Sequence, residues 1–312
     1  MTRRISIPLV IDLLIVDDAG QIAVLDAQPA VTRDLEMSNS WAVRWLGARL
    51  RKALSIGNTL LPALLPREDC IRQGQTAALE RRFGSRGENA AIAPEDVQVL
   101  ARYVRGEVGE AAMIERLQSV VGRQFAADYD ATSQTVHDAF LLDMAARSFV
   151  KGAWLRVTGQ VSSARQRMAQ ACDGDIYAAH ATVIALHSLT VPFRALRQHF
   201  GEFAAQSRSA ADIIAGVIEP PQRTLRSVSG PVEAPFLSSP LSAKSLLIFA
   251  PPPASGADVA FAMGRWSQCP AHAFVGRLLE DVWRAAIAPP QSPPETLPAR
   301  ELAAARADYV GA

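Results

Sequence analysis

A single cysteine at the start of a predicted helix is the residue of this chain best placed to do chemistry. Cys269 follows the loop FAMGRWSQ and directly precedes Pro270. Proline suits the first position of a helix, and the apolar rows in residues 271–287 predict a buried helix face. The free backbone N–H groups and the positive dipole end of a helix favour a thiolate at such a position. Arg265, four residues upstream, adds positive charge.

A thiolate stabilised in this way has several uses. It can be a nucleophile, a ligand to zinc or to an iron–sulfur cluster, or the axial ligand of heme iron. Nucleophilic catalysis needs a base, and His272 is near in sequence, but no cysteine-protease signature accompanies it. Zinc or a cluster needs several cysteines at close spacing, whereas Cys70 and Cys172 are remote and isolated. One thiolate is sufficient only for heme, and a small buried cysteine without chemistry is the open alternative.

The residues around this cysteine resemble the heme-binding loop of the cytochrome P-450 superfamily. That family has a phenylalanine, a glycine three residues on, a basic residue and the ligand cysteine before a helix. The corresponding residues here are Phe261, Gly264, Arg265 and Cys269. The loop has one residue more than usual after its glycine, and Ala271 stands where the family has glycine. The resemblance implies that Cys269 is the proximal iron ligand of heme b, an iron-protoporphyrin.

Further residues resemble the contacts that the family makes with the heme propionates. Arg226, in the segment after a Pro-Pro pair, is the best match for one propionate-binding arginine, with Arg223 second. Arg72, in REDCIRQGQTAALERRF, resembles a contact from the family's C helix. Planar guanidinium groups suit the carboxylates of propionates. Trp266 is placed either to flank the porphyrin edge, to donate from its indole N–H to a propionate, or simply to pack.

AAHAT, residues 178–182, resembles the oxygen-binding groove of the family's I helix and places Thr182 on its threonine. The acid that normally precedes this threonine is Ala181 here. His180 is a candidate replacement as proton donor, because the reference pKa of histidine is near neutrality; a core histidine is the alternative. The Glu-x-x-Arg pair of the family's K helix is absent, since Ile214 and Val217 hold its positions.

Helical patterns between residues 41 and 218 predict the body that positions these residues. Within it, IYAAHATVIALHSLTVPF, residues 176–193, predicts one long buried helix. Trp41, Trp45 and Trp154 lie in apolar helical segments, and we expect them to pack in the core.

Strands are expected near both ends of this body. Residues 1–27 predict a β-hairpin, with a strand to Val16, a turn at 17–20 and QIAVLDA as the returning strand. SLLIFA, residues 245–250, predicts another strand.

The expected fold is therefore mainly α with minor β, a shortened cytochrome P-450-like helical fold with small antiparallel β regions. Residues 1–287 would form one heme domain, in which a β region, the cysteine loop and the proximal helix occupy residues 219–287. The proline- and alanine-rich residues 288–312 would form a C-terminal tail.

Composition limits the partners and the compartment. The chain has 312 residues, of which 49% are hydrophobic, and a net charge of +1. This balance argues against a nucleic-acid or acidic-membrane binder, although a basic local patch remains possible. Three cysteines do not make a disulfide framework, so we expect a cytoplasmic protein. No segment has the features of a transmembrane helix, and we expect neither nucleic acid nor a membrane as a partner.

The resemblance implies a heme-thiolate oxidoreductase, a monooxygenase or peroxygenase, that acts on a small or medium apolar substrate. The chain has no G-x-G-x-x-G or Walker A motif, so an external ferredoxin or reductase would supply electrons, or peroxide would replace them. Two alternatives stay open. One is a heme-thiolate isomerase or dehydratase, or a peroxide-using enzyme, without a redox partner. The other is a degenerate helical scaffold that binds no heme and acts through protein contacts.

Overall fold

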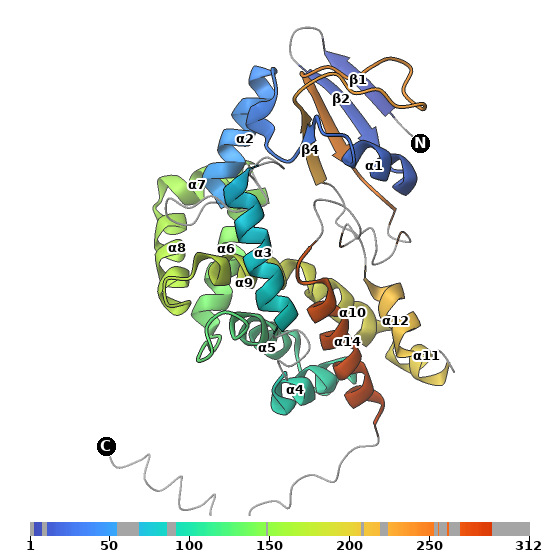
Figure 1. Cartoon of the computed structure of the whole chain (residues 1–312). Helices are drawn as coiled ribbons and strands as arrows, with labels where there is room; N and C mark the ends of the chain where they lie inside the picture. The colour runs from blue at the N-terminus through green and yellow to red at the C-terminus, as the bar shows by residue number, and fades with distance from the viewer. Residues whose placement is uncertain are drawn as a thin grey trace, which may run out of the picture.

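A small sheet lies beside a larger helical body (Figure 1). The computed structural model describes residues 3–7, 11–54, 69–85, 92–147, 149–206, 209–218, 224–252, 255, 261 and 269–288. The helices and strands, in chain order, are β1 (Arg3–Ile7), β2 (Ile11–Val16), α1 (Ala19–Asp26), β3 (Val31–Thr32), the 3-10 helix η1 (Leu35–Met37), α2 (Trp41–Leu54), α3 (Cys70–Ser85), α4 (Pro94–Val104), α5 (Glu110–Gly122), α6 (Ser133–Arg147), α7 (Phe149–Val157), α8 (Gln160–Ala171), α9 (Ile176–Ser188), α10 (Thr190–Gln198), α11 (Phe200–Ala205), α12 (Ala210–Val217), β4 (Thr224–Val228), β5 (Ser245–Phe249) and α14 (His272–Ile287). The expectation of a mainly α chain with minor β is confirmed.

The strands form one mixed sheet in the order β1-β2-β5-β4-β3. β2 and β5 are parallel, with Leu14 opposite Leu247, and the other neighbours are antiparallel. Among the described strands, three of the four pairings are antiparallel, as predicted, and only the β2–β5 pairing departs from the prediction. A parallel pair needs a long crossover connection, and the chain between β2 and β5, which contains the helices α1 to α12, provides it. The sheet thus joins the first strands of the chain to the strands that precede the cysteine loop.

The N-terminal hairpin is shorter than predicted, and its expected returning strand is a helix. β1 pairs with β2, and residues 8–10 between them lie outside the described part of the chain. QIAVLDA belongs to α1, because the Asp18 carboxylate accepts a hydrogen bond from the Gln21 N–H at 2.8 Å and caps the helix. Ile22, Leu25 and Asp26 are buried at helical spacing. A capped helix outcompetes the turn that Asp18 and Gly20 suggested.

Every described element between residues 41 and 218 is a helix, as predicted. The long helix expected over residues 176–193 is divided into α9 and α10 at Leu189. Pro192 has no N–H to donate to the Ser188 carbonyl, so the helical hydrogen bonds are interrupted there. The strand at 245–250 and the helix after the cysteine are confirmed, and Leu278, Leu279 and Val282 on α14 have no exposed surface. The predicted tail beyond residue 288 lies outside the described residues.

Three tryptophans predicted to lie in the core are on the surface. Trp41, Trp45 and Trp154 have 61%, 52% and 66% of their surface exposed. On α2 the inward face is instead the row of Val43, which is buried, and Gly47, where an added Cβ would lie 2.8 Å from the Leu35 Cβ. Since α2 carries two apolar rows, packing against η1 buries the row with the smaller side chains. In the described part of the chain, no helix is both long enough and apolar enough to cross a membrane.

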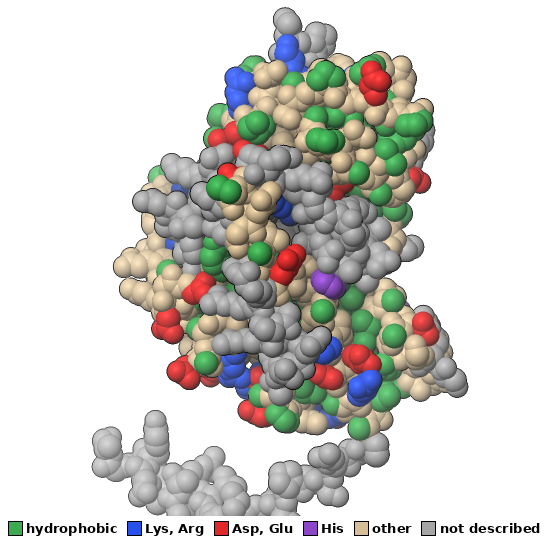
Figure 2. Space-filling model, in the orientation of Figure 1, with side chains coloured by type: hydrophobic (Ala, Val, Ile, Leu, Met, Phe, Trp, Pro, Cys, Tyr) green, Lys and Arg blue, Asp and Glu red, His purple; other side chains and the backbone are tan. Residues whose placement is uncertain are grey.

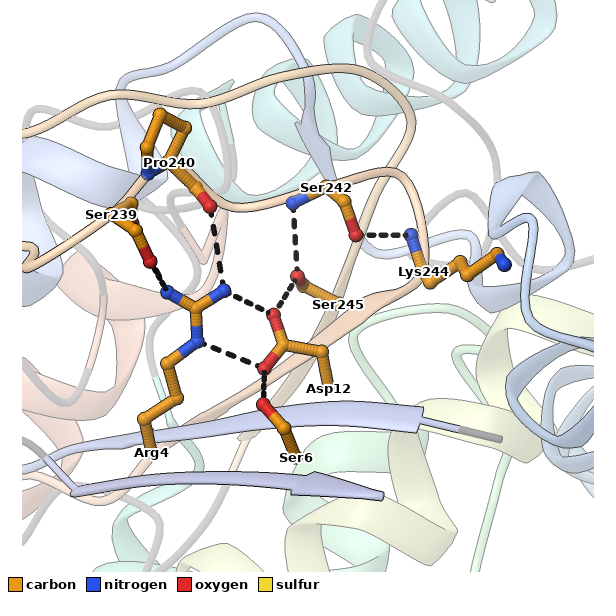
Figure 3. Close-up of polar contacts among 8 residues, drawn as sticks. All are labelled: Arg4, Ser6, Asp12, Ser239, Pro240, Ser242, Lys244 and Ser245. Carbon is orange, nitrogen blue, oxygen red and sulfur yellow. Dashed lines mark hydrogen bonds and ion pairs between the residues drawn. The ribbon is translucent and has the colours of Figure 1, made fainter. Parts of the chain in front are cut away.

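A polar network ties the edge of the sheet to the loop before β5 (Figure 3). The Asp12 carboxylate accepts hydrogen bonds from the Arg4 guanidinium and from the hydroxyls of Ser6 and Ser245. Arg4 also donates to the Ser239 hydroxyl at 2.5 Å. Burial alone would raise the pKa of Asp12, but the hydrogen bonds from Arg4, Ser245 and Ser6 outweigh it and lower the pKa to about 2.

The Asp12→Asn variant is expected to lose about 1–2 kcal/mol of stability at neutral pH, after allowance for solvent screening. The folded-state pKa of Asp12 is about 2 and the reference value is 3.8. The stabilisation is therefore complete above the reference value and is lost as the pH falls toward the folded-state value. Urea denaturation over this range should show the difference between Asp12→Asn and the wild type shrinking with acid. Ser239→Ala, which leaves the carboxylate in place, should show a constant difference; equal pH profiles for the two variants would contradict this account.

Candidate heme site

Three arginines converge on one buried carboxylate where the sheet meets the helical body. Arg226 on β4 donates from Nε to the Asp26 Oδ1 at 2.9 Å, and both side chains are almost completely buried. Arg33 directly follows β3, and Arg72 lies in the first turn of α3. The charges of Arg226, Arg72 and Asp26 all act on the pKa of Arg33, so the four side chains form one cluster. We call these four residues the arginine cluster.

Local structure explains why these residues meet. β3 and β4 are antiparallel and pair Thr32 with Ser227, so the next residues, Arg33 and Arg226, fall beside each other. Asp26 is the last residue of α1, which ends just before β3. Arg72 is held by the start of α3, where the Asp69 carboxylate accepts a hydrogen bond from the Arg72 backbone N–H at 3.1 Å.

The arginine cluster carries more positive than negative charge. Burial, then the charges of Arg226 and Arg72, lower the pKa of Arg33 to about 9, against the opposing effects of Asp26 and Cys269. Burial and Arg226 likewise lower the pKa of Arg72 to about 10, although Asp26 and Asp69 oppose this. Like charges that are buried together destabilise one another. An anion placed among the three guanidinium groups would relieve this repulsion and accept hydrogen bonds from them.

Cys269 lies three residues before the start of α14 and is hydrogen-bonded to Phe261. Its N–H donates to the Phe261 carbonyl at 2.9 Å, and Phe261 itself packs against the large core. The His272 ring Nδ1 lies 3.0 Å from the Cys269 carbonyl, and α14 begins at this histidine. Burial raises the pKa of the Cys269 thiol, against the effects of the Ala271 N–H and the Arg33 charge. The expected thiolate is therefore not favoured by the protein alone, because burial outweighs the N–H groups of the helix start.

The Arg33 charge also connects Cys269 to the arginine cluster, since each acts on the pKa of the other. Arg33, Cys269 and His180 share a further property. Each is partly buried, intermediate between core and surface.

On α9, the two predicted distal residues have different surroundings. Thr182 is completely buried, and its hydroxyl donates to the Ala179 carbonyl at 2.8 Å. Burial lowers the pKa of His180 to about 4. At neutral pH the imidazole is therefore neutral, whereas the sequence suggested a proton donor with a pKa near neutrality. Ala181, in the position of the family's acid, packs against the core.

Of the predicted site residues, the structure brings Phe261 to Cys269 and Arg72 to Arg226. Gly264, Arg265 and Trp266, and also Arg223, lie outside the described residues. Sequence reasoning missed Arg33 and Asp26, which sit in VTRDL and VLDA and match no motif. The pairing of β3 with β4 would have revealed Arg33, because the register extends from Thr32 and Ser227 to the two arginines.

Other metal chemistry has little support in the described residues. Among them, no group of three or more His, Cys, Asp and Glu side chains could hold a metal ion. Cys70, Cys172 and Cys269 are free thiols. The positions of the family's Glu-x-x-Arg pair, Ile214 and Val217, are buried on α12, which packs against α14. Apolar packing therefore occupies these two positions, and apolar groups can often take the place of a buried ion pair.

Comparison with known proteins gives a match in structure without a match in sequence. No protein-family model matches the chain, and no curated protein matches it. Cytochrome P-450 RauA, solved with a biosynthetic intermediate of aurachin RE, aligns over 88% of this chain and 83% of its own, with a TM-score of 0.55 at 10% identity. Cytochrome P-450 SP alpha with (R)-ibuprofen aligns over 93% and 87%, with a TM-score of 0.54 at 12% identity.

A 6-coordinated cytochrome P-450 from Thermus thermophilus aligns over 91% of this chain and 86% of its own, with a TM-score of 0.54 at 16% identity. The TM-scores indicate a shared architecture. At identities of 10–16%, the alignments do not establish the chemistry of this chain. This chain has a divergent cytochrome P-450-like fold.

Proposed function

We propose that the protein is a heme-thiolate oxidoreductase of cytochrome P-450 type that binds heme b through Cys269 and oxidises a small or medium apolar organic molecule. The observation that carries this proposal is the arginine cluster beside Cys269. Three guanidinium groups form one cluster, and the charge of Arg33 within it acts on the partly buried Cys269, in a P-450-like fold. The propionates of heme are the anions that this excess of buried positive charge would take.

The roles of the individual residues follow from their positions. Arg33, Arg72 and Arg226 would bind the propionates, and Asp26 would hold Arg226 in place through its Nε. Phe261 would fix the position of Cys269 through its carbonyl. Gly264, Arg265 and Trp266 keep the roles that the family resemblance implies. When bound through a thiolate, heme supplies chemistry that favours cleavage of the O–O bond.

On the distal side, His180 and Thr182 would handle protons. The neutral His180 ring would donate one hydrogen bond and accept another, and the Thr182 oxygen can still accept a hydrogen bond while its proton is donated to the Ala179 carbonyl. Two of the solved structures named above hold organic molecules, a biosynthetic intermediate of aurachin RE in one and (R)-ibuprofen in the other. These ligands belong to those proteins, and they support a substrate of similar apolar character here.

The replacement of the distal acid by Ala181 favours a second candidate function, in which peroxide replaces the external electron donor. The acid delivers protons in a reductase-driven oxygenase, and the His180 imidazole, which is neutral at pH 7, is a weak substitute for it. Turnover driven by hydrogen peroxide, compared with turnover driven by an external reductase and ferredoxin, separates the two candidates.

The decisive test is the ferrous–CO spectrum of the full chain produced with heme supplied. We expect a red-shifted Soret band of the thiolate type, and we expect the Cys269→Ser variant to lose it because serine provides no thiolate. Cys70→Ser, which removes an exposed thiol, is the matched control and should keep the band. Failure of the wild type to retain heme would favour the scaffold alternative, and an unchanged band in Cys269→Ser would exclude this cysteine as the ligand.

A further inference from the structure

Two surface helices carry tryptophans and cations without any acidic residue. The exposed stripe of α2 contains Trp41, Arg44 and Trp45 at helical spacing. The exposed stripe of α7 contains Lys151, Trp154 and Val157, the last with 83% of its surface exposed. Side chains at these spacings share one helix face. Each helix therefore presents aromatic and basic groups together to solvent.

Charge is concentrated on these helices. The sequence WAVRWLGARLRKAL of α2 contains four Lys or Arg residues, FVKGAWLRV of α7 contains two, and neither contains Asp or Glu. The whole chain has a net charge of only +1, so the remainder is slightly acidic. Over the lower part of the helical body in Figure 2, acidic and basic side chains are intermixed. The sequences of α2 and α7 are therefore locally basic, and the described Arg44 and Lys151 place part of this charge on the surface.

The two helices share a neighbour, since both pack against α6. α6 contributes two more exposed apolar side chains, Phe140 and Met144. Arg49 stacks on the Trp45 ring, with its Cζ 4.7 Å from the ring centroid, so a cation and an aromatic group are held together at the surface. We name the exposed residues Trp41, Arg44, Trp45, Lys151, Trp154 and Val157 the tryptophan face.

We propose that the tryptophan face docks the protein peripherally on a membrane surface that contains anionic lipids. Tryptophan rings favour the headgroup level of a bilayer, where one end of the ring is apolar and the other is hydrated. Cations on the same helices are attracted to acidic headgroups. A second copy of this chain fits the surface less well, because two basic faces would repel each other. The proposal is independent of the heme site.

The test is binding of the full chain to phosphatidylcholine vesicles with and without phosphatidylglycerol. We expect sedimentation with the anionic vesicles, weakened by added salt, and a blue shift of tryptophan fluorescence. The double variant Trp41→Ser/Trp45→Ser should bind about tenfold more weakly, and Lys151→Gln about fivefold more weakly. Trp154→Ser tests the second helix separately. Circular dichroism verifies folding, which surface substitutions should leave intact.

Ile287→Ser is the matched control, since it removes an apolar side chain that is 50% exposed at the end of α14, outside the tryptophan face. It should bind vesicles like the wild type. The proposal is overturned if anionic vesicles do not bind the protein, or if folded tryptophan variants bind as well as the wild type. It is also overturned if, without lipid, the protein forms a dimer that the tryptophan substitutions abolish, because the face would then be an interface between copies.

Discussion

The Asp26→Asn variant is expected to lose about 3–5 kcal/mol of stability in the heme-free protein, the range found when one partner of a buried ion pair is removed. The carboxylate has no exposed surface and accepts the Arg226 Nε–H. It also acts favourably on the charges of Arg33 and Arg72. Asparagine keeps the shape and one acceptor oxygen but removes the charge, so three buried guanidinium groups would face one another with less compensation.

Chemical denaturation of the heme-free variant measures this loss. Asp138→Asn is the matched control, because Asp138 is equally buried but pairs with a single arginine, Arg167, whose side chain is 44% exposed. Water can solvate Arg167 after the substitution, so we expect a smaller loss there. If heme binds as proposed, its propionates should restore much of the stability of Asp26→Asn and little of that of Asp138→Asn. Equal losses in the two heme-free variants would show that the arginine cluster is not under electrostatic strain.

The sequence predicted correctly those elements whose local pattern of apolar residues is compatible with only one type of secondary structure. The apolar rows of α14 can be buried in only one way, and the run SLLIF is too short for a helix between its flanking loops. α1 was mistaken for a strand because DDAG is both a turn sequence and a helix start. The competition was decided by the Asp18 cap and by the burial of Ile22 and Leu25 against the sheet, which is tertiary information.

The residues of the candidate site likewise fall into those that local sequence could predict and those that depend on tertiary structure. The position of Cys269 before a helix could be recognised from local sequence, as could the arginine after the Pro-Pro pair. Arg33 could not, because its place depends on which strand pairs with β3 and in what register. The pKa of His180 also escaped sequence reasoning, since burial sets it and no single-sequence pattern reports burial of a polar side chain. The exposed tryptophans are the opposite case, in which residue type suggested burial that packing did not provide.

Replacing Arg33 with methionine should have opposite effects on the heme-free protein and on heme binding. Arg33 is held charged at neutral pH although burial and two neighbouring arginines oppose its charge. An apolar side chain of similar length removes that repulsion, so we expect the heme-free protein to gain about 1–2 kcal/mol, within the range found when buried charges are replaced by apolar groups. The same substitution removes a charge-assisted hydrogen-bond donor for a propionate, and we expect heme to bind about tenfold more weakly.

This pair of effects distinguishes a binding role from a structural one. Titration of the heme-free protein with hemin measures the affinity, and denaturation without heme measures the stability. Arg194→Met is the control, because Arg194 is 53% exposed and pairs with Glu110 on the surface, so it should change neither quantity appreciably. A structural arginine would lower both stability and affinity when removed, and that result would contradict the proposal. Burial and two neighbouring arginines both oppose the charge of Arg33, and that charge costs stability in the heme-free protein. Binding of an anion such as a heme propionate would explain why an arginine stands at this position.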